Sequence, residues 1–182
     1  LVRKMAAARN ARLKVTATTE RRDVLPDATV VICTIGVGGR RVQIFPRVEP
    51  LRAPEPWMSG AVSGWPAVVE ECEPVERLPG SDHFTRAPHP RTAVGLSADR
   101  QLLYLVVADG RREGVSGLTL PELARLMDDL GACTAVNLDG GGWSAMWVRD
   151  RIVNQPSDLI ERPVANHLAV LVVTEPAPPR ED

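Results

Sequence analysis

The sequence predicts one α+β domain, in which few helices accompany a mixed β-sheet that contains a strand–helix–strand unit. The 182 residues are 44% apolar and 25% charged, which is ordinary for a globular chain with a single core. Most apolar runs have the length of a strand and end near glycine or proline. One stretch, residues 119–131, carries a clear helical pattern.

The strand–helix–strand unit lies in the second half of the chain. Leu102–Val107 is an apolar run of strand length, and Thr134–Leu138 is another. Between them, Thr119 and Glu122 have the spacing of a capping box, and an apolar stripe at helical spacing follows. Strands joined through a helix in this way are expected to be parallel neighbours in one sheet.

Further strands are predicted where runs are β-branched or alternate between apolar and polar residues. They cover Thr29–Ile35, Arg41–Phe45, Ala67–Val69, a hairpin of Ser144–Val148 with Ile152–Val153, and Leu168–Val173.

The chain divides into three parts, and its composition argues against several protein classes. We interpret residues 1–22 as an N-terminal extension or edge strand, residues 23–174 as the domain, and residues 175–182 as a disordered tail. The net charge of −1 favours no nucleic-acid partner, and no run of about 18 apolar residues indicates a membrane span. The basic start has no following apolar run, so no signal peptide is predicted, and nothing indicates an oligomeric state.

The cysteines and histidines are not expected to form a site. Cys33 and Cys133 lie in apolar surroundings and are interpreted as buried small hydrophobic residues, and with Cys72 they form no disulfide framework. No spacing resembles a zinc site, and no metal-ligand set is predicted. His83 and His89 lie in a proline-rich loop, where we expect them to be solvated.

The most informative stretch is Asn137-Leu138-Asp139-Gly140-Gly141-Gly142-Trp143-Ser144. Three consecutive glycines are costly, because each loses much backbone freedom on folding. They are tolerated where φ is positive or where another group comes very close. The stretch is therefore either a site for a polar or anionic group or a tight turn that the aspartate caps.

Two carboxylates are predicted to lie at the same edge of the sheet. Asp109 and Asp139 each closely follow one strand of the strand–helix–strand unit. Ligands bind at the carboxyl edge in open α/β sheets, so this placement favours a functional site. Two aspartates with asparagine oxygens could also hold Ca²⁺ or Mg²⁺, although the sequence requires no cofactor.

Several motifs occur together in a characteristic order. They are Pro90–Gly95, Asp109–Arg111, Gly117–Thr119 with Glu122–Ala124, Asn137–Gly142 and Glu161–Asn166. From about residue 25 to residue 173, this arrangement resembles the phosphodiester glycosidase domain family. The resemblance implies hydrolysis of a sugar-1-phosphodiester, of the N-acetylglucosamine-1-phosphate type, in a glycan or cell-envelope polymer. It also implies an exported or cell-envelope protein whose partner is a sugar phosphate or glycan.

The implied chemistry assigns roles to named residues. Because the leaving group is a weakly basic phosphate, the site needs charge complementarity and a carboxylate more than a strong general acid. Asp139 is the first candidate for base or nucleophile, and Asp109 is the second. The guanidinium groups that could bind phosphate belong to Arg91, Arg111 and Arg162. The other substrate-binding candidates are Thr92, Asn137, Gly140, Gly141, Gly142, Ser144, Asn154 and Asn166.

The sequence departs from the family pattern at two places. A serine usually follows the triple glycine, whereas here Trp143 stands in that position and Ser144 comes next. The family's upstream Asn-Gly-Gly-Phe-Phe-type motif is not found, so the chain is either a truncated product or a protein that has lost that half. The alternative function is therefore a carbohydrate- or phosphoglycan-binding module without turnover.

Overall fold

The computed structural model describes residues 2–6, 13–18, 28–32, 42–44, 64–158 and 167–172. Within them the chain forms two β-sheets and two helices, which confirms the predicted single α+β domain with few helices. The elements in chain order are β1 (Val2–Ala6), β2 (Leu13–Thr18), β3 (Ala28–Ile32), β4 (Ala67–Glu70), β5 (Glu73–Pro74), α1 (Asp82–Arg86), β6 (Arg91–Leu96), β7 (Leu103–Ala108), α2 (Leu120–Asp129), β8 (Thr134–Asn137), β9 (Met146–Val148), β10 (Arg151–Ile152) and β11 (His167–Val172).

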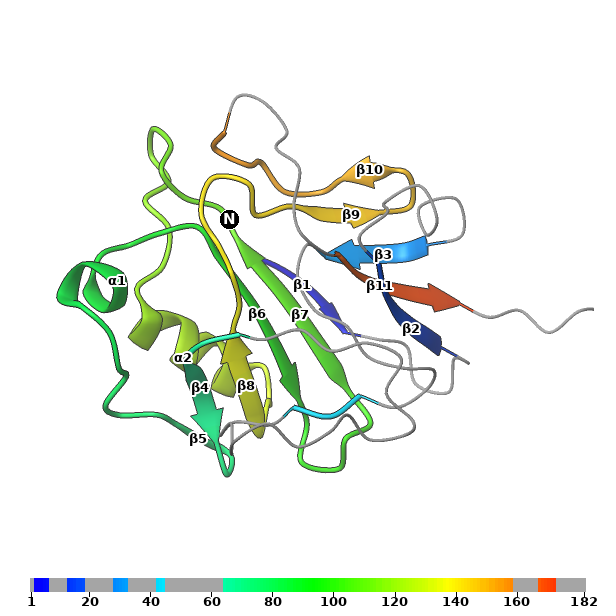
Figure 1. Ribbon diagram of the computed structural model, residues 1–182, viewed down its shortest axis with the longest axis horizontal. Coiled ribbons are helices and arrows are strands. Elements are labelled where there is room, and N and C mark those ends of the chain that lie inside the picture. Colours follow the sequence, from blue (N-terminus) through cyan, green and yellow to red (C-terminus); the bar gives the residue numbers. More distant parts are fainter. Residues whose placement is uncertain are drawn as a thin grey trace, which may run out of the picture.

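Helix α2 and the two sheets form three layers (Figure 1). The central sheet has six strands in the order β1-β7-β6-β8-β4-β5, and the second sheet has five in the order β10-β9-β3-β11-β2. Helix α2 packs on the central sheet, mainly against β4 and β5. The five-stranded sheet covers the opposite face of the central sheet, so the central sheet is enclosed on both sides.

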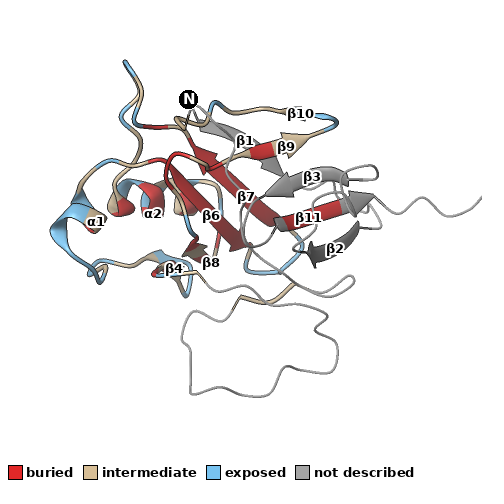
Figure 2. Ribbon diagram, turned by 45° about the horizontal axis from the view of Figure 1, so that its top comes forward, coloured by how far each residue is buried: buried red, intermediate tan, exposed pale blue. Residues whose placement is uncertain are grey.

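Two hydrophobic cores follow from the alternation of side chains along the central strands. On β7, Leu105 and Val107 belong to the cluster shared with the five-stranded sheet, which includes Leu168. The intervening Tyr104 and Val106 belong to the cluster shared with α2. Every residue of β6 and β7 is buried, and Figure 2 shows both strands as the buried centre of the molecule.

The predicted strand–helix–strand unit is present, but its two strands are not neighbours. Strand β6 lies between β7 and β8 and pairs antiparallel with both. The strands β7 and β8 therefore run in the same direction without contacting each other as a ladder. The sequence reading missed β6 because Arg91 and Gly95 interrupt its apolar run. Gly95 is needed there, since a Cβ would lie 2.7 Å from Met127 of α2 and 2.9 Å from Ala132.

Most other predicted elements are confirmed. Helix α2 has its capping box at Thr119 and Glu122, and strands form in the predicted segments around β3, β4, β8 and β11. The β9–β10 hairpin turns through Arg149 and Asp150, which both have positive φ. Two expectations were wrong: residues 42–44 are not a strand, and the loop before residue 90 contains α1, which Ser81 caps.

The N-terminal segments add one strand to each sheet. Strand β1 pairs with β7 at the edge of the central sheet, and β2 pairs with β11 at the edge of the second. The alternating pattern of residues 13–17 thus marks an edge strand. The predictions made for Cys33 and residues 175–182 lie outside the described residues.

The expectation that the cysteines form no disulfide was wrong. Cys72, in the β4–β5 turn, is bonded to Cys133, the residue before β8. The two are 61 residues apart, and the backbone N–H of Cys72 also donates to the carbonyl of Cys133 at 2.9 Å. Local sequence could not reveal the bond, because the antiparallel pairing of β4 with β8 brings the two cysteines together.

Reducing this disulfide is expected to lower the free energy of unfolding by about 2–5 kcal/mol, because it releases a loop of roughly 60 residues in the unfolded chain. Urea unfolding with and without dithiothreitol measures the effect. The double variant Cys72→Ser with Cys133→Ser is the control, and its stability should not respond to the reductant. Equal stability of oxidised and reduced wild-type protein would contradict the expectation.

Candidate functional site

Three chain segments meet at one end of the central sheet. Strand β6 begins there at Arg91, which pairs with Ala108 at the end of β7. Two residues further along β6, Ala93 pairs with Asn137 at the end of β8. Figure 1 shows the chain leaving β7 and β8 at the end where β6 begins. Asp109 and Asp139 consequently lie at the same end of the central sheet, as predicted. Their strands, β7 and β8, lie on either side of β6.

Glycines allow both loops to touch the backbone at the start of β6. A Cβ on Gly110 would lie 2.8 Å from the nitrogen of Pro90, and a Cβ on Gly140 would lie 2.8 Å from the oxygen of Pro90. The Gly141 N–H donates to the same oxygen at 3.0 Å. Gly117, with a φ of +106°, packs directly on the carbonyl of His89. The glycines are therefore required by close backbone contact.

The side chain of Arg111 lies beside the triple glycine. Its Nη1 is 3.6 Å from the place that a Cβ on Gly141 would occupy. Its Nη2 is 3.0 Å from Nδ1 of His89. Arg111 is exposed, and it pairs with no carboxylate within the part of the chain that the structure describes. A cation thus stands next to a backbone that carries no side chains.

The imidazole of His89 is neutral and accepts a hydrogen bond from Arg111. Its Nε2 is 3.0 Å from the carbonyl of His83, so Nε2 carries the proton and Nδ1 accepts from Arg111. Burial lowers the pKa of His89, the hydrogen bond to the His83 carbonyl opposes that effect, and the charges of Arg91 and Arg111 lower the pKa further. The prediction that these histidines are only solvated missed this role, because the Arg111 contact joins residues 22 positions apart.

The guanidinium of Arg91 forms its hydrogen bonds within the protein. It is 3% exposed and donates to the carbonyls of Leu118 at 3.0 Å, Phe84 at 2.6 Å and Ala87 at 3.4 Å. Burial, followed by the nearby charge of Arg111, lowers the pKa of Arg91 to about 10. These contacts tie α1 and the loop before α2 to β6, which favours a positioning role over phosphate binding.

Asp109 and Asn154 form the second polar link of the site. Oδ1 of Asp109 accepts from Nδ2 of Asn154 and from the N–H of Gln155, both at 2.9 Å. Nδ2 of Asn154 also donates to the carbonyl of Ser144 at 2.7 Å, and its Oδ1 accepts from the N–H of Met146 at 2.7 Å. The amide protons of Asn154 are thus used within the protein, and one oxygen of Asp109 is held in place.

The carboxylate of Asp139 has different surroundings from that of Asp109. It is exposed, and its Oδ1 accepts from the N–H of Gly140 at 3.0 Å. Among the described residues no further partner of its carboxylate occurs. Asp139 therefore differs from Asp109 in being exposed and in having no described partner outside its own loop.

The remaining candidates differ in their surroundings. Asn137 and Ser144 are each 3% exposed, and within the described residues Oδ1 of Asn137 and Oγ of Ser144 have no hydrogen-bond partner. Thr92 is buried within β6, and its carbonyl accepts from the N–H of Leu138. Gly142 has Asp158 where a Cβ would stand. Arg162 and Asn166 lie outside the described residues.

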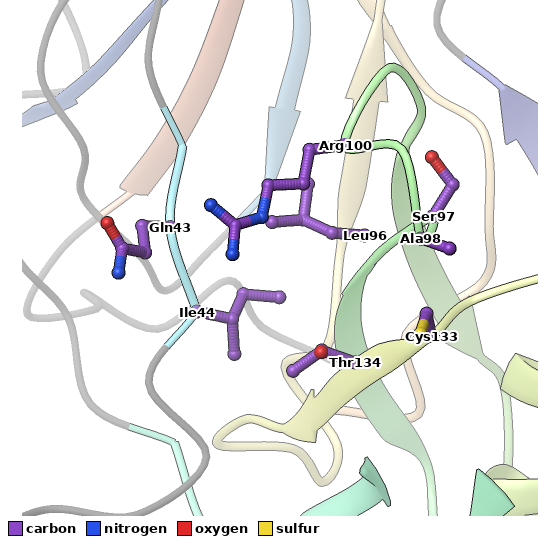
Figure 3. Close-up of a pocket in the computed structure, with 8 residues that line it drawn as sticks. All are labelled: Gln43, Ile44, Leu96, Ser97, Ala98, Arg100, Cys133 and Thr134. Carbon is purple, nitrogen blue, oxygen red and sulfur yellow. The ribbon is translucent and has the colours of Figure 1, made fainter. Parts of the chain in front are cut away.

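Two hollows differ in their relation to this site. One, of about 230 Å³, is bounded by Ala108, Asp109 and residues 114–118. The other, of about 140 Å³, lies at the opposite end of β6, where the Arg100 side chain extends toward Gln43 and Ile44 (Figure 3). It contains none of the predicted site residues.

Within the described residues there is no group of three or more His, Cys, Asp or Glu side chains arranged for a metal ion. No helix in that part of the chain is long and apolar enough to cross a membrane.

His89 is expected to titrate below its ordinary pKa of 6.5, because burial and two arginines disfavour its charged form. Since the unfolded chain binds this proton more readily, the contribution of His89 to stability is complete above pH 6.5 and is lost as the pH falls below it. The C2–H resonance of His89, followed by NMR from pH 8 to 4, measures the pKa. A midpoint at or above 6.5 would contradict the lowered pKa of His89.

Two glycines of one loop provide a matched test of the close backbone contact. Gly114 and Gly117 both have positive φ, but a Cβ on Gly114 meets nothing within 4 Å, whereas a Cβ on Gly117 would overlap the carbonyl of His89. Gly114→Ala should cost about 1–2 kcal/mol of stability through backbone strain. Gly117→Ala should cost more and should also shift the His89 resonances. Equal losses in chemical unfolding would remove the case for this contact.

Sequence comparison extends these observations. Residues 7–171 match the family model described as phosphodiester glycosidase. Over 82 residues, 45% of this chain and 13% of the relative, the sequence is 39% identical to an SPbeta prophage-derived uncharacterized protein, YomE, of Bacillus subtilis (strain 168). Over 88 residues, 48% of this chain and 17% of the relative, it is 34% identical to N-acetylglucosamine-1-phosphodiester alpha-N-acetylglucosaminidase of Mus musculus. The chain thus spans less than a fifth of either relative.

The fold has a solved counterpart. The catalytic domain of the zebrafish N-acetylglucosamine-1-phosphodiester alpha-N-acetylglucosaminidase, described as auto-inhibited by its pro-peptide, matches with a TM-score of 0.66. The match covers 88% of this chain and 73% of that one at 16% identity, so it concerns the fold alone. The family model extends over most of the chain, which confirms the resemblance carried by the sequence motifs. The chain belongs to the phosphodiester glycosidase family.

Proposed function

We propose that this chain hydrolyses a sugar-1-phosphodiester, of the N-acetylglucosamine-1-phosphate type, in a glycan or cell-envelope polymer. One observation carries the proposal. The guanidinium of Arg111, held by neutral His89, lies against the glycine turn that follows Asp139. A cation for phosphate and a carboxylate for the anomeric carbon are thus carried by adjoining loops.

Phosphate binding falls to Arg111 and the turn. A guanidinium forms two parallel hydrogen bonds with phosphate oxygens, and Arg111 retains N–H groups beyond the one directed to His89. Gly141 carries no side chain, which lets a phosphate bound by Arg111 approach the turn. The N–H groups of Gly140 and Gly141 already donate to Asp139 and to the Pro90 carbonyl, so the positive charge for the phosphate comes from Arg111. Arg162 stays a candidate from the family motif.

The carboxylate of Asp139 acts at the sugar. It serves either as the base that takes a proton from the attacking water or as the nucleophile at C1, in which case a water molecule hydrolyses the bond between Asp139 and C1 in a second step. In both courses the bond between C1 and the phosphate oxygen breaks, and its electron pair leaves on the phosphate. Because that phosphate is a weak base, little protonation is needed. Arg111 stabilises the charge that develops on it.

The other candidates position these groups or contact the sugar. Asp109 and Asn154 keep the loop after β7 joined to the segment that follows the glycines. Asn137 and Ser144 are buried beside that turn, and their side-chain oxygens have no hydrogen-bond partner among the described residues, which suits a role in positioning the turn. Thr92 and Gly142 are buried and support the site from behind, and Asn166 stays a candidate from the family motif.

The disulfide supports an exported location for the proposed enzyme. Bonds such as Cys72–Cys133 persist in secreted, periplasmic and cell-surface proteins and are rare in a reducing cytosol. An envelope polymer would be accessible to a protein in that location.

Substitutions at the two principal residues should separate their roles. Asp139→Asn is expected to lower kcat for the methyl phosphodiester of N-acetylglucosamine by about 10²–10⁴-fold with the fold intact. Arg111→Gln should lower kcat/KM by roughly 10²–10³-fold, because it removes charge from the phosphate. Arg125→Gln, on the exposed side of α2, is the matched control and should retain full activity. Sugar release measured by chromatography gives the rates, and circular dichroism verifies folding.

The alternative outcomes are distinct. Full activity of Asp139→Asn would overturn its assignment as base or nucleophile. Turnover abolished by EDTA and restored by Ca²⁺ or Mg²⁺ would instead make Asp109 and Asp139 metal ligands. Binding of the phosphodiester by folded wild-type protein without release of sugar would favour a binding module.

A further inference from the structure

A tryptophan is exposed at the same end of the central sheet. Trp65 is 54% exposed and, among the described residues, stands out as the exposed large hydrophobic side chain. Its carbonyl accepts from Nδ2 of Asn137 at 2.8 Å, and the carbonyl of Pro66 accepts from the N–H of Asn137 at 3.0 Å. Asn137 ends β8, two residues before Asp139. The backbone of Trp65 is thus fixed next to the strand that leads into the candidate site.

The indole ring packs against a neighbouring aromatic ring. It stacks on Phe84 with ring centroids 5.4 Å apart and planes inclined by 20°. The Arg91 guanidinium lies over the Phe84 ring at 5.1 Å and also donates to the Phe84 carbonyl. Gly80 leaves room for the indole, since a Cβ there would lie 3.3 Å from the Trp65 ring. A ligand that packs on this ring would therefore lose little conformational freedom in ordering it.

The surroundings of the ring favour a sugar as its occupant. Helix α1, which carries Phe84, is largely exposed (Figure 2), and its Asp82 and Arg86 side chains are 91% and 80% exposed. Among the described residues Trp65 alone is an exposed large hydrophobic side chain, so it does not form the contiguous apolar patch that a protein partner requires. One face of a pyranose ring carries C–H groups that pack on the electron-rich face of an aromatic ring. Its hydroxyls stay available to water and to polar neighbours.

We propose that Trp65 is a stacking platform for a sugar ring of a glycan, adjacent to the sugar whose phosphodiester is cleaved. The identity of the substrate rests on the proposed function. Two connections join the platform to the site. Asn137 contacts the carbonyl of Trp65 and leads to Asp139, and Arg91 extends from β6 to Phe84 beneath the indole. The chain thereby recognises a polymer rather than an isolated sugar phosphodiester.

Calorimetric titration with linear tetrasaccharides of N-acetylglucosamine, glucose and mannose tests the platform without requiring turnover. At least one of the three should bind wild-type protein, and Trp65→Ala should weaken its affinity by about fivefold or more. Trp65→Phe keeps an aromatic face and should retain part of the affinity. Arg86→Ala, on the neighbouring helix α1, is the control and should bind like wild type.

NMR of the indole N–H groups gives a second measurement that does not rely on Trp65→Ala being folded. The resonance that is missing in Trp65→Phe identifies Trp65, and this resonance should shift when the tetrasaccharide is added to wild-type protein. Unchanged affinity in Trp65→Ala, an unshifted Trp65 resonance, or no binding of any of the three sugars would overturn the proposal. Binding through Trp65 by a protein that releases no sugar from the methyl phosphodiester would overturn the proposed function alone.

Discussion

The candidate site depends on the contact of two loops with the first residues of β6. The chain after β7 and the chain after β8 both reach the Pro90 backbone, and glycine is the residue type that allows this approach. A side chain on Gly110 or Gly140 would push one loop outward. Arg111 and the glycine turn would then separate, because each belongs to a different loop. The glycines therefore determine the geometry of the site as much as the charged residues do.

A second layer of hydrogen bonds keeps these loops in place. His89 links Arg111 to the backbone near α1, Arg91 binds three carbonyls, and Asn154 joins Asp109 to Ser144. These groups are polar, yet most of their hydrogen-bonding capacity is used inside the protein. This explains why residues of one type differ in role. Asp109 is held by amide donors of the segment that follows the glycines, whereas Asp139 is exposed and accepts from the adjacent Gly140.

Local patterns predicted the elements whose stabilising interactions lie close together in the sequence. Helix α2 was recognised because its cap and apolar stripe fall within a dozen residues, and β7, β8 and β11 were recognised from their apolar runs. Strand β6 was not predicted because Arg91 and Gly95 are explained by contacts with distant segments. Arg91 donates to carbonyls of other segments, and Gly95 allows α2 to pack closely. The Cys72–Cys133 bond was missed for the same reason, since it joins segments 61 residues apart.

The sequence by itself determined the fold class, the helix with its cap, the family, and the two aspartates that follow β7 and β8. Those features can be predicted from composition, from periodicity over a few residues and from the order of motifs. None of these depends on contacts between distant segments. Only the tertiary structure decided that β6 separates those strands, that Arg91 is buried against carbonyls, that His89 supports Arg111, and that Trp65 stands exposed beside the site. Each of these depends on segments far apart in the chain, and their separation and orientation are set by packing rather than by local sequence.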